Sequence, residues 1–555
     1  MMPAPVPLKR RMNSQATLLA GLLLSLIMHA HADPILTSWF TENSGMLARV
    51  IQGKANATLT TPVTTWPSAG VSNLNENATS QSMPAYSDIQ RIRYTSTDVY
   101  INANGLASYT MGPWYSSATQ TSLFSRWPLA KDYQIRITRS PSVPMNKTKH
   151  PGGLIALMVN GVAVYDLGDA HSFVSSSGNA STPTSTTGSD AMNASGYWSR
   201  DALAVEVTTF DLGFAHQPGN GQYHYHAQPK ALRYQLGDGM SASYNATTNT
   251  YTYSDTDPTG AVTPLHHSPI LGWSFDGYPI YGPYGYSSAN NSSSSITRMR
   301  TGFVLRNGSY KTANLTATGR TTLPKWAAIA QGYRSIGNYT STANLTALGD
   351  FPLTPAQYGP AANYTTVTGP NTTTYSLGRY IGDYDFLGDN GYTQGVDFDL
   401  DQYNGRTCVT PEYPSGIYAY FVTIDSSGNT VFPHMLGKEF YGTQNYTANA
   451  TIPTSGITEL FNGGPNVKET LQSPALNTSN NTVTLSWSSV EGGTYAIEAS
   501  SNLSGNWTTI NSTTAGAAQS TSTNFTENGT AADSKRFYRV KRTATATYDP
   551  AYTGQ

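Results

Sequence analysis

Short runs in which hydrophobic and polar residues alternate recur along the chain and predict β-strands. Successive side chains of a strand point to opposite faces, so each run can turn one apolar face toward a core. Residues that favour turns (Gly, Pro, Asn and Asp) separate the runs, and helical periodicity is scarce. We therefore expect a mainly β protein with long loops. The clearest runs are Asp132–Thr138, Ala204–Thr209, Ile417–Thr423 and Thr482–Trp487.

The last part of the chain has the pattern of a separate, small β-sandwich. A change in composition near residue 446 indicates a linker, which we place at residues 446–473. Short predicted strands follow at spacings typical of a two-sheet sandwich, over residues 474–546. Its aromatic residues are expected to form the core, namely Trp487, Tyr495, Trp507 and Tyr538.

This C-terminal stretch resembles the fibronectin type III-like modules that are appended to secreted bacterial proteins. The resemblance implies a spacer or a weak binding module, and the fold alone does not fix its function. The residues that carry it are Leu485–Trp487, Tyr495–Glu498, Leu503 with Trp507, and Arg536–Arg539.

The first 32 residues have the organisation of a secretory signal peptide. Lys9–Arg11 is basic, Ala16–Met28 is apolar, and Ala30–Ala32 offers a small-x-small cleavage site. The apolar run is shorter than the roughly 20 residues that span a bilayer, which favours cleavage over an uncleaved anchor. The mature chain, beginning with a β-rich extension over residues 33–94, is expected to be periplasmic or extracellular, with no later transmembrane segment.

Two pairs of segments in the middle of the chain echo one another. Val159–Tyr165 parallels Phe275–Tyr281, and each places an Asn-Gly or Asp-Gly turn before an alternating run. A second echo pairs Phe210–Leu212 and Gly221–His226 with Phe398–Leu400 and Gly416–Phe421. The copies keep the pattern Gly-x-Tyr-x-Tyr, but the two histidines of the first become alanine and phenylalanine in the second. We infer that the tyrosines serve the strand architecture and the histidines serve something else.

Charge and cysteine content narrow the classes of function. Among 555 residues, 32 are Lys or Arg and 33 are Asp or Glu, which gives a net charge of -1. A chain with so little net charge has no positive electrostatic field that would attract nucleic acid or an anionic membrane. Its single cysteine, Cys408, excludes an internal disulfide framework and any CxxC motif. A bound metal would therefore be held by nitrogen and oxygen ligands.

Five histidines fall between residues 216 and 267 and suggest such a metal site. In Tyr223–His226 the strand period of two sends both imidazoles to one face and both tyrosines to the other. A turn-rich segment could fold His216 back beside this strand, and His266 or His267 could complete the site. All-imidazole ligation favours copper or zinc over magnesium or calcium, which prefer oxygen.

Other roles are open for each of these residues. The histidines could be strand residues satisfied by hydrogen bonds alone. Asp276 either forms its Asp-Gly turn or orients a metal-bound imidazole through the free N–H of the ring. Glu206 is either an ion-pair partner near Arg200 and Asp201 or a general base, and we favour the ion pair.

The ordered set of motifs over residues 95–445 resembles the YHYH domain of secreted bacterial proteins. The central motif is Tyr223–His226, preceded by Gly221 and followed by His267–Ile270 and Asp276–Pro283. The other matching segments are Asn160–Gly161, Trp198–Asp201, Asn404–Arg406, Pro411–Pro414 and Phe432–His434. The resemblance implies a domain boundary and a motif, but it implies no reaction.

Two classes of function follow. The first is a secreted protein with one histidine-bound copper or zinc ion, which could be a metal-dependent enzyme of unknown reaction. The second is an extracellular carbohydrate-binding or adhesive module, in which tyrosines and tryptophans contact a polysaccharide or a small molecule and the histidines are structural. No nucleophile or phosphate-binding motif favours a particular enzyme class.

Overall fold

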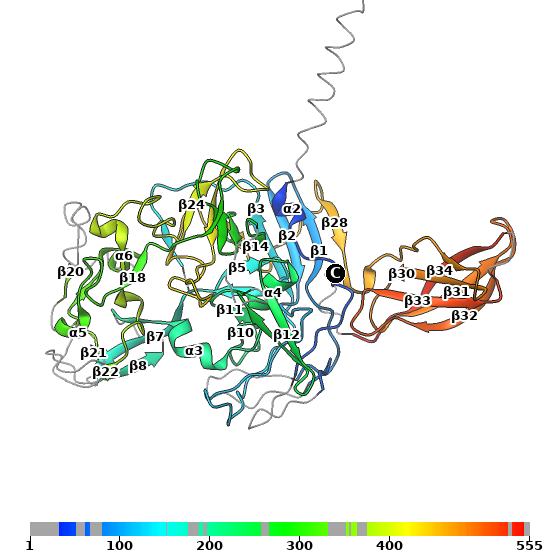
Figure 1. Cartoon of the computed structure of the whole chain (residues 1–555), viewed down its shortest axis with the longest axis horizontal. Helices are drawn as coiled ribbons and strands as arrows, with labels where there is room; N and C mark the ends of the chain where they lie inside the picture. Colours follow the sequence, from blue (N-terminus) through cyan, green and yellow to red (C-terminus); the bar gives the residue numbers. More distant parts are fainter. Residues whose placement is uncertain are drawn as a thin grey trace, which may run out of the picture.

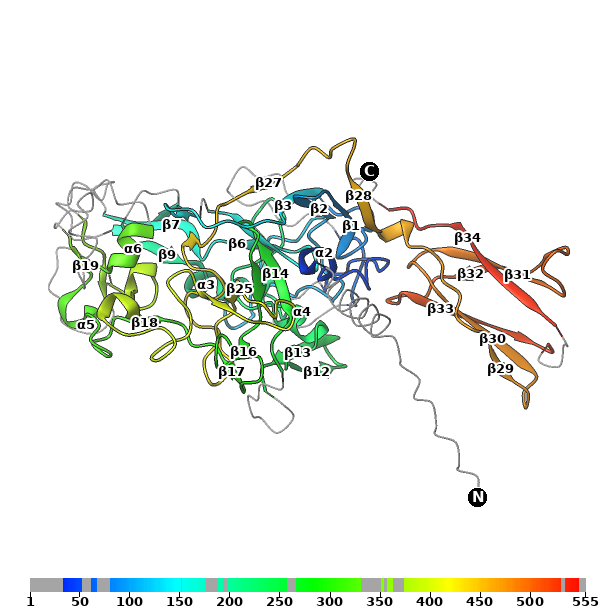
Figure 2. The ribbon, with the colours of Figure 1, turned by 90° about the horizontal axis from the view of Figure 1, so that it is seen from above.

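The computed structural model shows a β-rich body with a small β-sandwich at one end (Figures 1 and 2). It describes residues 33–51, 61–66, 80–150, 152–175, 188–192, 197–256, 266–330, 351–353, 357–362, 374–530 and 535–548. The predicted signal peptide lies outside the described residues.

A five-stranded sheet forms one layer of the body. Its order is β27-β3-β2-β1-β28, and all its pairs are antiparallel. The two edge strands come from residues 446–473, so this segment is not the free linker that composition suggested. The strands are β1 (Ile89–Tyr94), β2 (Asp98–Ala103), β3 (Tyr133–Thr138), β27 (Tyr446–Thr447) and β28 (Thr458–Asn462).

An eight-stranded sheet forms the second layer, and its order is β10-β11-β6-β5-β14-β15-β25-β24. Hairpins β5-β6 and β14-β15 meet at its centre, and each continues outward into a parallel neighbour, β11 or β25. The strands are β5 (Leu154–Met158), β6 (Ala163–Tyr165), β10 (Ala215–His216), β11 (His224–Tyr225), β14 (Ile270–Ser274), β15 (Pro279–Tyr281), β24 (Gly405–Cys408) and β25 (Ile417–Phe421).

The main hydrophobic core contains residues of both sheets, including Ile101 and Ile135 of the first and Leu157 and Leu271 of the second. At the turn between β5 and β6, a glycine allows this hairpin to lie close to β2 of the five-stranded sheet. Gly161 has φ +78°, and a Cβ there would lie 2.5 Å from the Cβ of Ala103. The two copies of each sequence echo lie in opposite halves of the eight-stranded sheet: β6 and β15 for the first echo, and β11 and β25 for the second.

Smaller elements complete the body. One three-stranded sheet contains β7 (Gly168–Ser175), β8 (Gly188–Met192) and β9 (Ser199–Asp201). The other small sheets are two-stranded and pair β12 (Ser241–Asn245) with β13 (Thr250–Ser254), β16 (Tyr284–Tyr286) with β17 (Ile296–Arg298), β18 (Phe303–Leu305) with β23 (Tyr384–Phe386), β19 (Thr322–Leu323) with β20 (Phe351–Pro352), β21 (Ala361–Ala362) with β22 (Thr374–Tyr375), and β4 (Thr148–Lys149) with β26 (Glu439–Phe440). The α-helices are α2 (Pro34–Thr37), α3 (Ala202–Glu206), α4 (Lys230–Gln235), α5 (Leu315–Thr318) and α6 (Lys325–Ala330), and the 3-10 helices are η2 (Val207–Thr209), η6 (Ile381–Asp383), η7 (Leu387–Asn390) and η8 (Gly464–Asn466).

One strand prediction is wrong. Ala204–Thr209 alternates like a strand, yet it forms most of α3 and all of η2. The side chain of Asp201 accepts a hydrogen bond from the backbone N–H of Leu203 at 3.1 Å and so caps the start of α3. Six alternating residues are too few to outweigh a local capping signal.

The C-terminal region is a sandwich of two three-stranded sheets, as expected. One sheet contains β29 (Ala475–Asn477), β30 (Thr482–Ser488) and β33 (Ser522–Asn528), and the other contains β31 (Thr494–Ser500), β32 (Thr508–Ala515) and β34 (Phe537–Ala544). Trp487 and Tyr495 are buried in its core and Tyr538 packs against them. Trp507 does not join this core. It is half-buried beneath the Arg539 guanidinium, which lies 4.5 Å from the centre of its ring.

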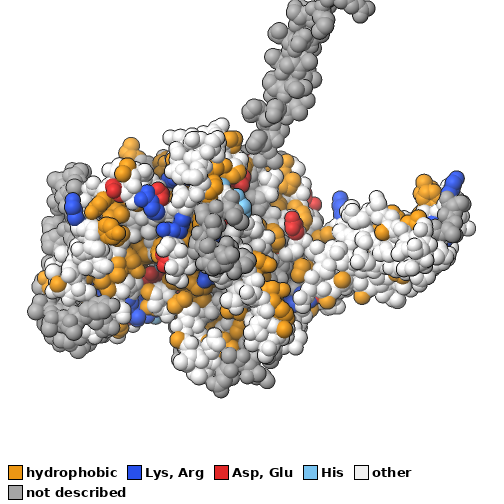
Figure 3. Space-filling view, viewed as in Figure 1, with side chains coloured by type: hydrophobic (Ala, Val, Ile, Leu, Met, Phe, Trp, Pro, Cys, Tyr) orange, Lys and Arg blue, Asp and Glu red, His pale blue; other side chains and the backbone are white. Residues whose placement is uncertain are grey.

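Charged side chains are sparse on the face shown in Figure 3, in keeping with the composition. Within the part of the chain that the structure describes, no helix is both long enough and apolar enough to cross a membrane.

Candidate metal centre

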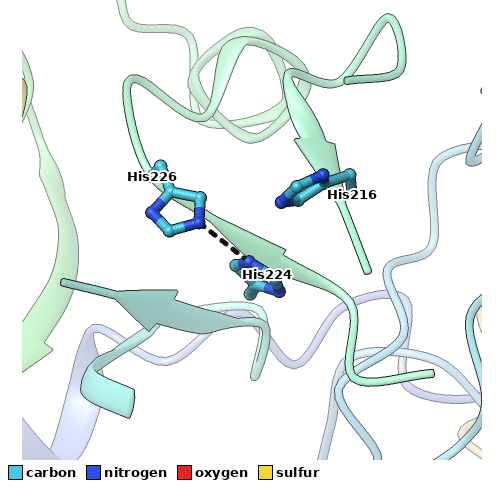
Figure 4. A group of neighbouring side chains, drawn as sticks. All are labelled: His216, His224 and His226. Atoms are coloured by element: carbon cyan, nitrogen blue, oxygen red, sulfur yellow. Dashed lines mark hydrogen bonds between the residues drawn. The ribbon is translucent and has the colours of Figure 1, made fainter. Parts of the chain in front are cut away.

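A short β-hairpin brings three of the predicted histidines together. Strands β10 and β11 pair antiparallel, with His216 directly opposite His224, and His226 follows β11. Figure 4 shows the three rings facing a common space. One ligand nitrogen can be chosen from each ring such that all three lie within 4.8 Å of one another.

The tyrosines of the motif point to the opposite face, as the strand period predicted. Tyr223 and Tyr225 are almost fully buried, at 1% and 0% exposure. The Tyr223 hydroxyl donates to Asp211 at 2.7 Å, and the Tyr109 hydroxyl bonds the Tyr225 hydroxyl at 2.6 Å. These contacts fix the strand, so the histidine face has a defined orientation.

Hydrogen bonds determine which nitrogen of two of the rings is available. The Nδ1 atom of His224 lies 2.8 Å from the carbonyl of Gln222, and that of His226 lies 2.9 Å from the carbonyl of Asp166. A carbonyl can only accept, so both Nδ1 atoms carry a proton and both Nε2 atoms keep a lone pair in the neutral rings. The Nδ1 atom of His216 bonds the Thr209 hydroxyl at 2.7 Å.

The two lone pairs lie close together. The Nε2 atoms of His224 and His226 are 3.0 Å apart. With both Nδ1 atoms already protonated, neutral rings have no hydrogen to share between these nitrogens, and their lone pairs repel. A cation between them, either a metal ion or an added proton, removes the conflict.

A carboxylate that the sequence did not identify as a ligand borders the group, beside two of its three histidines. One Glu206 oxygen lies 3.2 Å from His226 Nε2 and 3.5 Å from His216 Nε2. Ligand atoms about 2.1 Å from a tetrahedral ion lie about 3.4 Å from one another, so these separations fit a shared ion. The ion-pair role that we favoured for Glu206, near Arg200 and Asp201, is replaced by contact with imidazoles. The helical geometry of α3, hidden by the strand-like pattern, produces this placement.

The local electrostatics favour neutral rings at two of the three positions. Burial, followed by repulsion from neighbouring imidazoles, holds the pKa values of His216 and His224 well below the ordinary value. Burial also acts to lower the pKa of His226, but the hydrogen bond and charge of Glu206 outweigh it and raise that pKa. Neutral imidazoles and one carboxylate are the donor set of a zinc or copper site.

Aromatic rings enclose the histidines. Tyr165 stacks on His224 with ring centres 3.8 Å apart, and Phe210 packs edge-on against His216 at 4.7 Å. The three histidines are only 2–6% exposed. Glu206 is the open side of the group, because its side chain is 28% exposed.

The structure does not bring His266 and His267 into this group. His267 packs against Tyr281 and Phe421, which belong to β15 and β25. Three strands separate β11 from β15, a distance on the order of 20 Å at about 4.8 Å per strand. The exposed His266 hydrogen-bonds the carbonyl of Gly237 at 3.0 Å. The sequence of the segment that leads to these two histidines does not indicate which half of the sheet they approach.

Asp276 is also remote from the imidazoles, and it stabilises its own turn. Within the turn its carboxylate accepts a hydrogen bond from the backbone N–H of Tyr278 at 3.3 Å, and it also accepts from the Tyr420 hydroxyl at 2.6 Å and from the backbone N–H of Gly442 at 2.7 Å. Burial raises its pKa in spite of these bonds. The groups that do orient the rings are the backbone carbonyls of Gln222 and Asp166 and the hydroxyl of Thr209. Every residue has a backbone carbonyl, so the sequence could not indicate which ones would contact the histidines.

Comparison with known proteins agrees with the motif. The family model described as YHYH protein matches residues 134–431, which include both halves of the eight-stranded sheet from β5 to β25. No curated protein and no solved structure matches the chain.

Proposed function

Since this chain belongs to the YHYH protein family, we propose that it is a secreted metal-binding protein in which the family motif supplies two ligands to one zinc or copper ion. The other ligands are His216 and Glu206. The signal-like segment at residues 1–32 supports export. The C-terminal sandwich, with its fibronectin type III-like sequence pattern, then serves as a spacer or a second binding module.

One observation carries the proposal. Two Nε2 atoms, each left with a lone pair by a carbonyl on the other side of its ring, face each other at 3.0 Å. His216 faces the same space, and one Glu206 oxygen lies within 3.5 Å of the Nε2 atoms of His226 and His216. A metal ion uses all of these donors at once, whereas an added proton joins only one pair of them.

The donor set also bears on what the ion does. Three imidazoles and one carboxylate fill a tetrahedral site and suit zinc, and copper accepts the same ligands in a flatter geometry. If the partly exposed Glu206 side chain swings away, one coordination position would open and a bound ion could polarise a water molecule. This movement is the route by which the site would act as an enzyme.

Metal analysis of the secreted protein, purified without a metal-affinity tag, tests the proposal. We expect about one zinc or copper ion per chain in the wild type, and near zero in the double variant His224→Ala/His226→Ala. His266→Ala is the matched control, because that histidine is exposed and remote, and its metal content should equal that of the wild type. Substoichiometric metal in the wild type, or unchanged metal in the double variant, would refute the proposal.

A further inference from the structure

The eight-stranded sheet repeats the hairpin of the metal centre at its other end. Ala419 lies opposite Arg406 in the pair β25-β24, as His224 lies opposite His216 in the pair β11-β10. Tyr420 pairs with Ile280 of β15, as Tyr225 pairs with Val164 of β6. The two ends therefore have the same strand arrangement.

The second end has exchanged every donor of the metal centre. Arg406 stands at the position of His216, and Ala419 and Phe421 stand at those of His224 and His226. Gln394 lies four residues before Phe398, as Glu206 lies four residues before Phe210. A cationic guanidinium, a methyl group, a phenyl ring and an amide do not form a metal site.

A cavity of about 600 Å³ lies at this end, beside the edge strand β24. Its volume is in the range of pockets that bind small organic ligands, roughly 300–1,000 Å³. Its lining is mainly polar and includes Ser287, Gln394, Asp399, Arg406, Tyr418 and Tyr441. The β24-β25 hairpin therefore has the strand arrangement of the β10-β11 hairpin, but it borders a cavity in place of a histidine group.

Arg406 is the unusual member of this lining. It is 6% exposed, its Nη2 donates to the carbonyl of Tyr286 at 2.6 Å, and its Nε is buried without a hydrogen-bond partner. In the part of the chain that the structure describes, no carboxylate forms an ion pair with it. A buried cation without a counter-charge is costly, and an anionic group in the cavity would compensate it.

The carboxylates that line the cavity are already engaged by other groups. Both oxygens of Asp399 accept hydrogen bonds from the Arg300 guanidinium, at 3.0 Å each. Asp401 accepts from the Tyr418 hydroxyl at 2.9 Å and from the backbone N–H of Tyr403 at 2.9 Å. Neither carboxylate pairs with Arg406, so the Arg406 guanidinium has no counter-charge among the residues that line the cavity.

The rest of the lining suits a polyhydroxylated ring. Tyr418 and Tyr441 stack face to face with their ring centres 3.4 Å apart, and Lys147 Nζ lies 4.2 Å from the centre of the Tyr441 ring, so the pair offers the cavity a rigid wall of ring edges. Hydroxyl and amide side chains, such as those of Ser287 and Gln394, can exchange hydrogen bonds with several hydroxyl groups. A small inorganic anion would leave most of this volume and this wall without contacts.

We propose that this cavity binds an acidic saccharide, with the carboxylate of a uronic acid residue paired to Arg406 and the sugar ring beside Tyr418 and Tyr441. The site is independent of the metal centre, because it lies at the opposite end of the sheet and shares none of its ligands. A protein outside the cell would meet such saccharides as polymers, and the cavity would hold one or two residues of the polymer.

Isothermal titration calorimetry of the full mature chain tests this site, with trigalacturonate and trimannuronate as ligands. The methyl ester of trigalacturonate is the matched neutral ligand, since it keeps the rings and hydroxyls and removes the charge. We expect wild-type protein to bind at least one acid, and the ester to bind at least about tenfold more weakly. Absence of binding by both acids at millimolar concentration, or equal binding of acid and ester, would overturn the proposal.

Variants assign the binding to Arg406. Arg406→Gln should weaken binding of the acid at least about tenfold and leave binding of the ester unchanged, whereas Arg406→Lys should retain part of the affinity. Arg539→Gln on the C-terminal sandwich is the control and should bind as the wild type does. Metal content and thermal unfolding of Arg406→Gln report whether the body remains folded. Unchanged acid binding in folded Arg406→Gln would refute the assignment.

Discussion

At the scale of single residues, the metal centre follows from which ring nitrogen each histidine can offer. Carbonyls of Gln222 and Asp166 accept hydrogen bonds from the Nδ1–H groups of His224 and His226, so the unprotonated Nε2 atoms face inward. Alternation along Tyr223–His226 made this pair of histidines predictable from the sequence. Glu206 was not predictable as a ligand, because its placement depends on a helix that the local pattern did not indicate.

Glu206→Gln should reduce metal affinity by at least about tenfold. The amide keeps the size of the side chain but removes the negative charge that faces His226 and His216. Competition with a chelator of known affinity measures the change. An affinity equal to that of the wild type would show that Glu206 is a neighbour of the site and not a ligand.

Asp88 gives a prediction about pH. It is fully buried, its carboxylate accepts the backbone N–H of Ser108 at 3.0 Å, and burial raises its pKa to about 7. An unfolded aspartate has a pKa of about 3.9, so between about pH 4 and 7 the folded state binds more protons than the unfolded state. Stability should therefore fall as pH rises through this window and level off above it.

Asp88→Asn removes this titration. Urea unfolding at pH 5 and pH 8 should show a loss of stability in the wild type that exceeds the loss in the variant by on the order of 2 kcal/mol. The comparison between the two proteins cancels other groups that titrate in the same range. Equal losses in both would mean that Asp88 is already ionised at pH 5.

At the scale of secondary structure, the alternation of hydrophobic and polar residues predicted the strands correctly but did not predict the short helix α3. Asp132–Thr138 and Ile417–Thr423 contain β3 and β25, and Thr482–Trp487 covers all but the last residue of β30, because alternation in a run bounded by turn residues reflects one buried face. Ala204–Thr209 alternates by coincidence, and the cap at Asp201 decides its conformation. The ligand from α3 thus depends on one capping hydrogen bond.

Asp201→Ala should destabilise the fold and weaken metal binding together. The change removes the cap of α3 and the carboxylate that lies 3.0 Å from His434 Nε2, at a cost of about 1–3 kcal/mol. Asp201→Asn is the matched variant, since asparagine also caps helices well. Urea unfolding and chelator competition measure both effects. Full metal affinity in Asp201→Ala would show that the position of Glu206 does not depend on this cap.

At the scale of the whole molecule, the sequence echoes predicted a repeat but not its consequence. The copies form the two halves of one sheet, so the same scaffold carries a donor cluster at one end and a cavity at the other. The order of strands within the sheet depends on long-range pairing that local patterns do not encode, which is why His266 and His267 could not be placed. The same limit explains why residues 446–473, expected as a linker, instead provide two edge strands.

The C-terminal sandwich is joined to the body by a buried ion pair between Arg49 and Glu491. Glu491 also accepts the backbone N–H of Leu47 at 3.0 Å. Glu491→Ala should cost about 3–5 kcal/mol, because it leaves a buried arginine without a counter-charge, with a hydrogen bond to the carbonyl of Leu47 as its remaining contact. The double variant Arg49→Met/Glu491→Leu should recover part of this loss. Urea unfolding measures both variants, and a cost below 1 kcal/mol for Glu491→Ala would contradict a structural role of the pair.

The most direct test of the metal centre is anomalous X-ray diffraction from crystals of the secreted protein, recorded at the zinc and copper absorption edges. The account predicts one anomalous peak about 2.1 Å from the Nε2 atoms of His216, His224 and His226, with a Glu206 oxygen at a similar distance. No peak between these rings at either edge, in crystals where the Nε2 atoms of His224 and His226 still face each other, would contradict it.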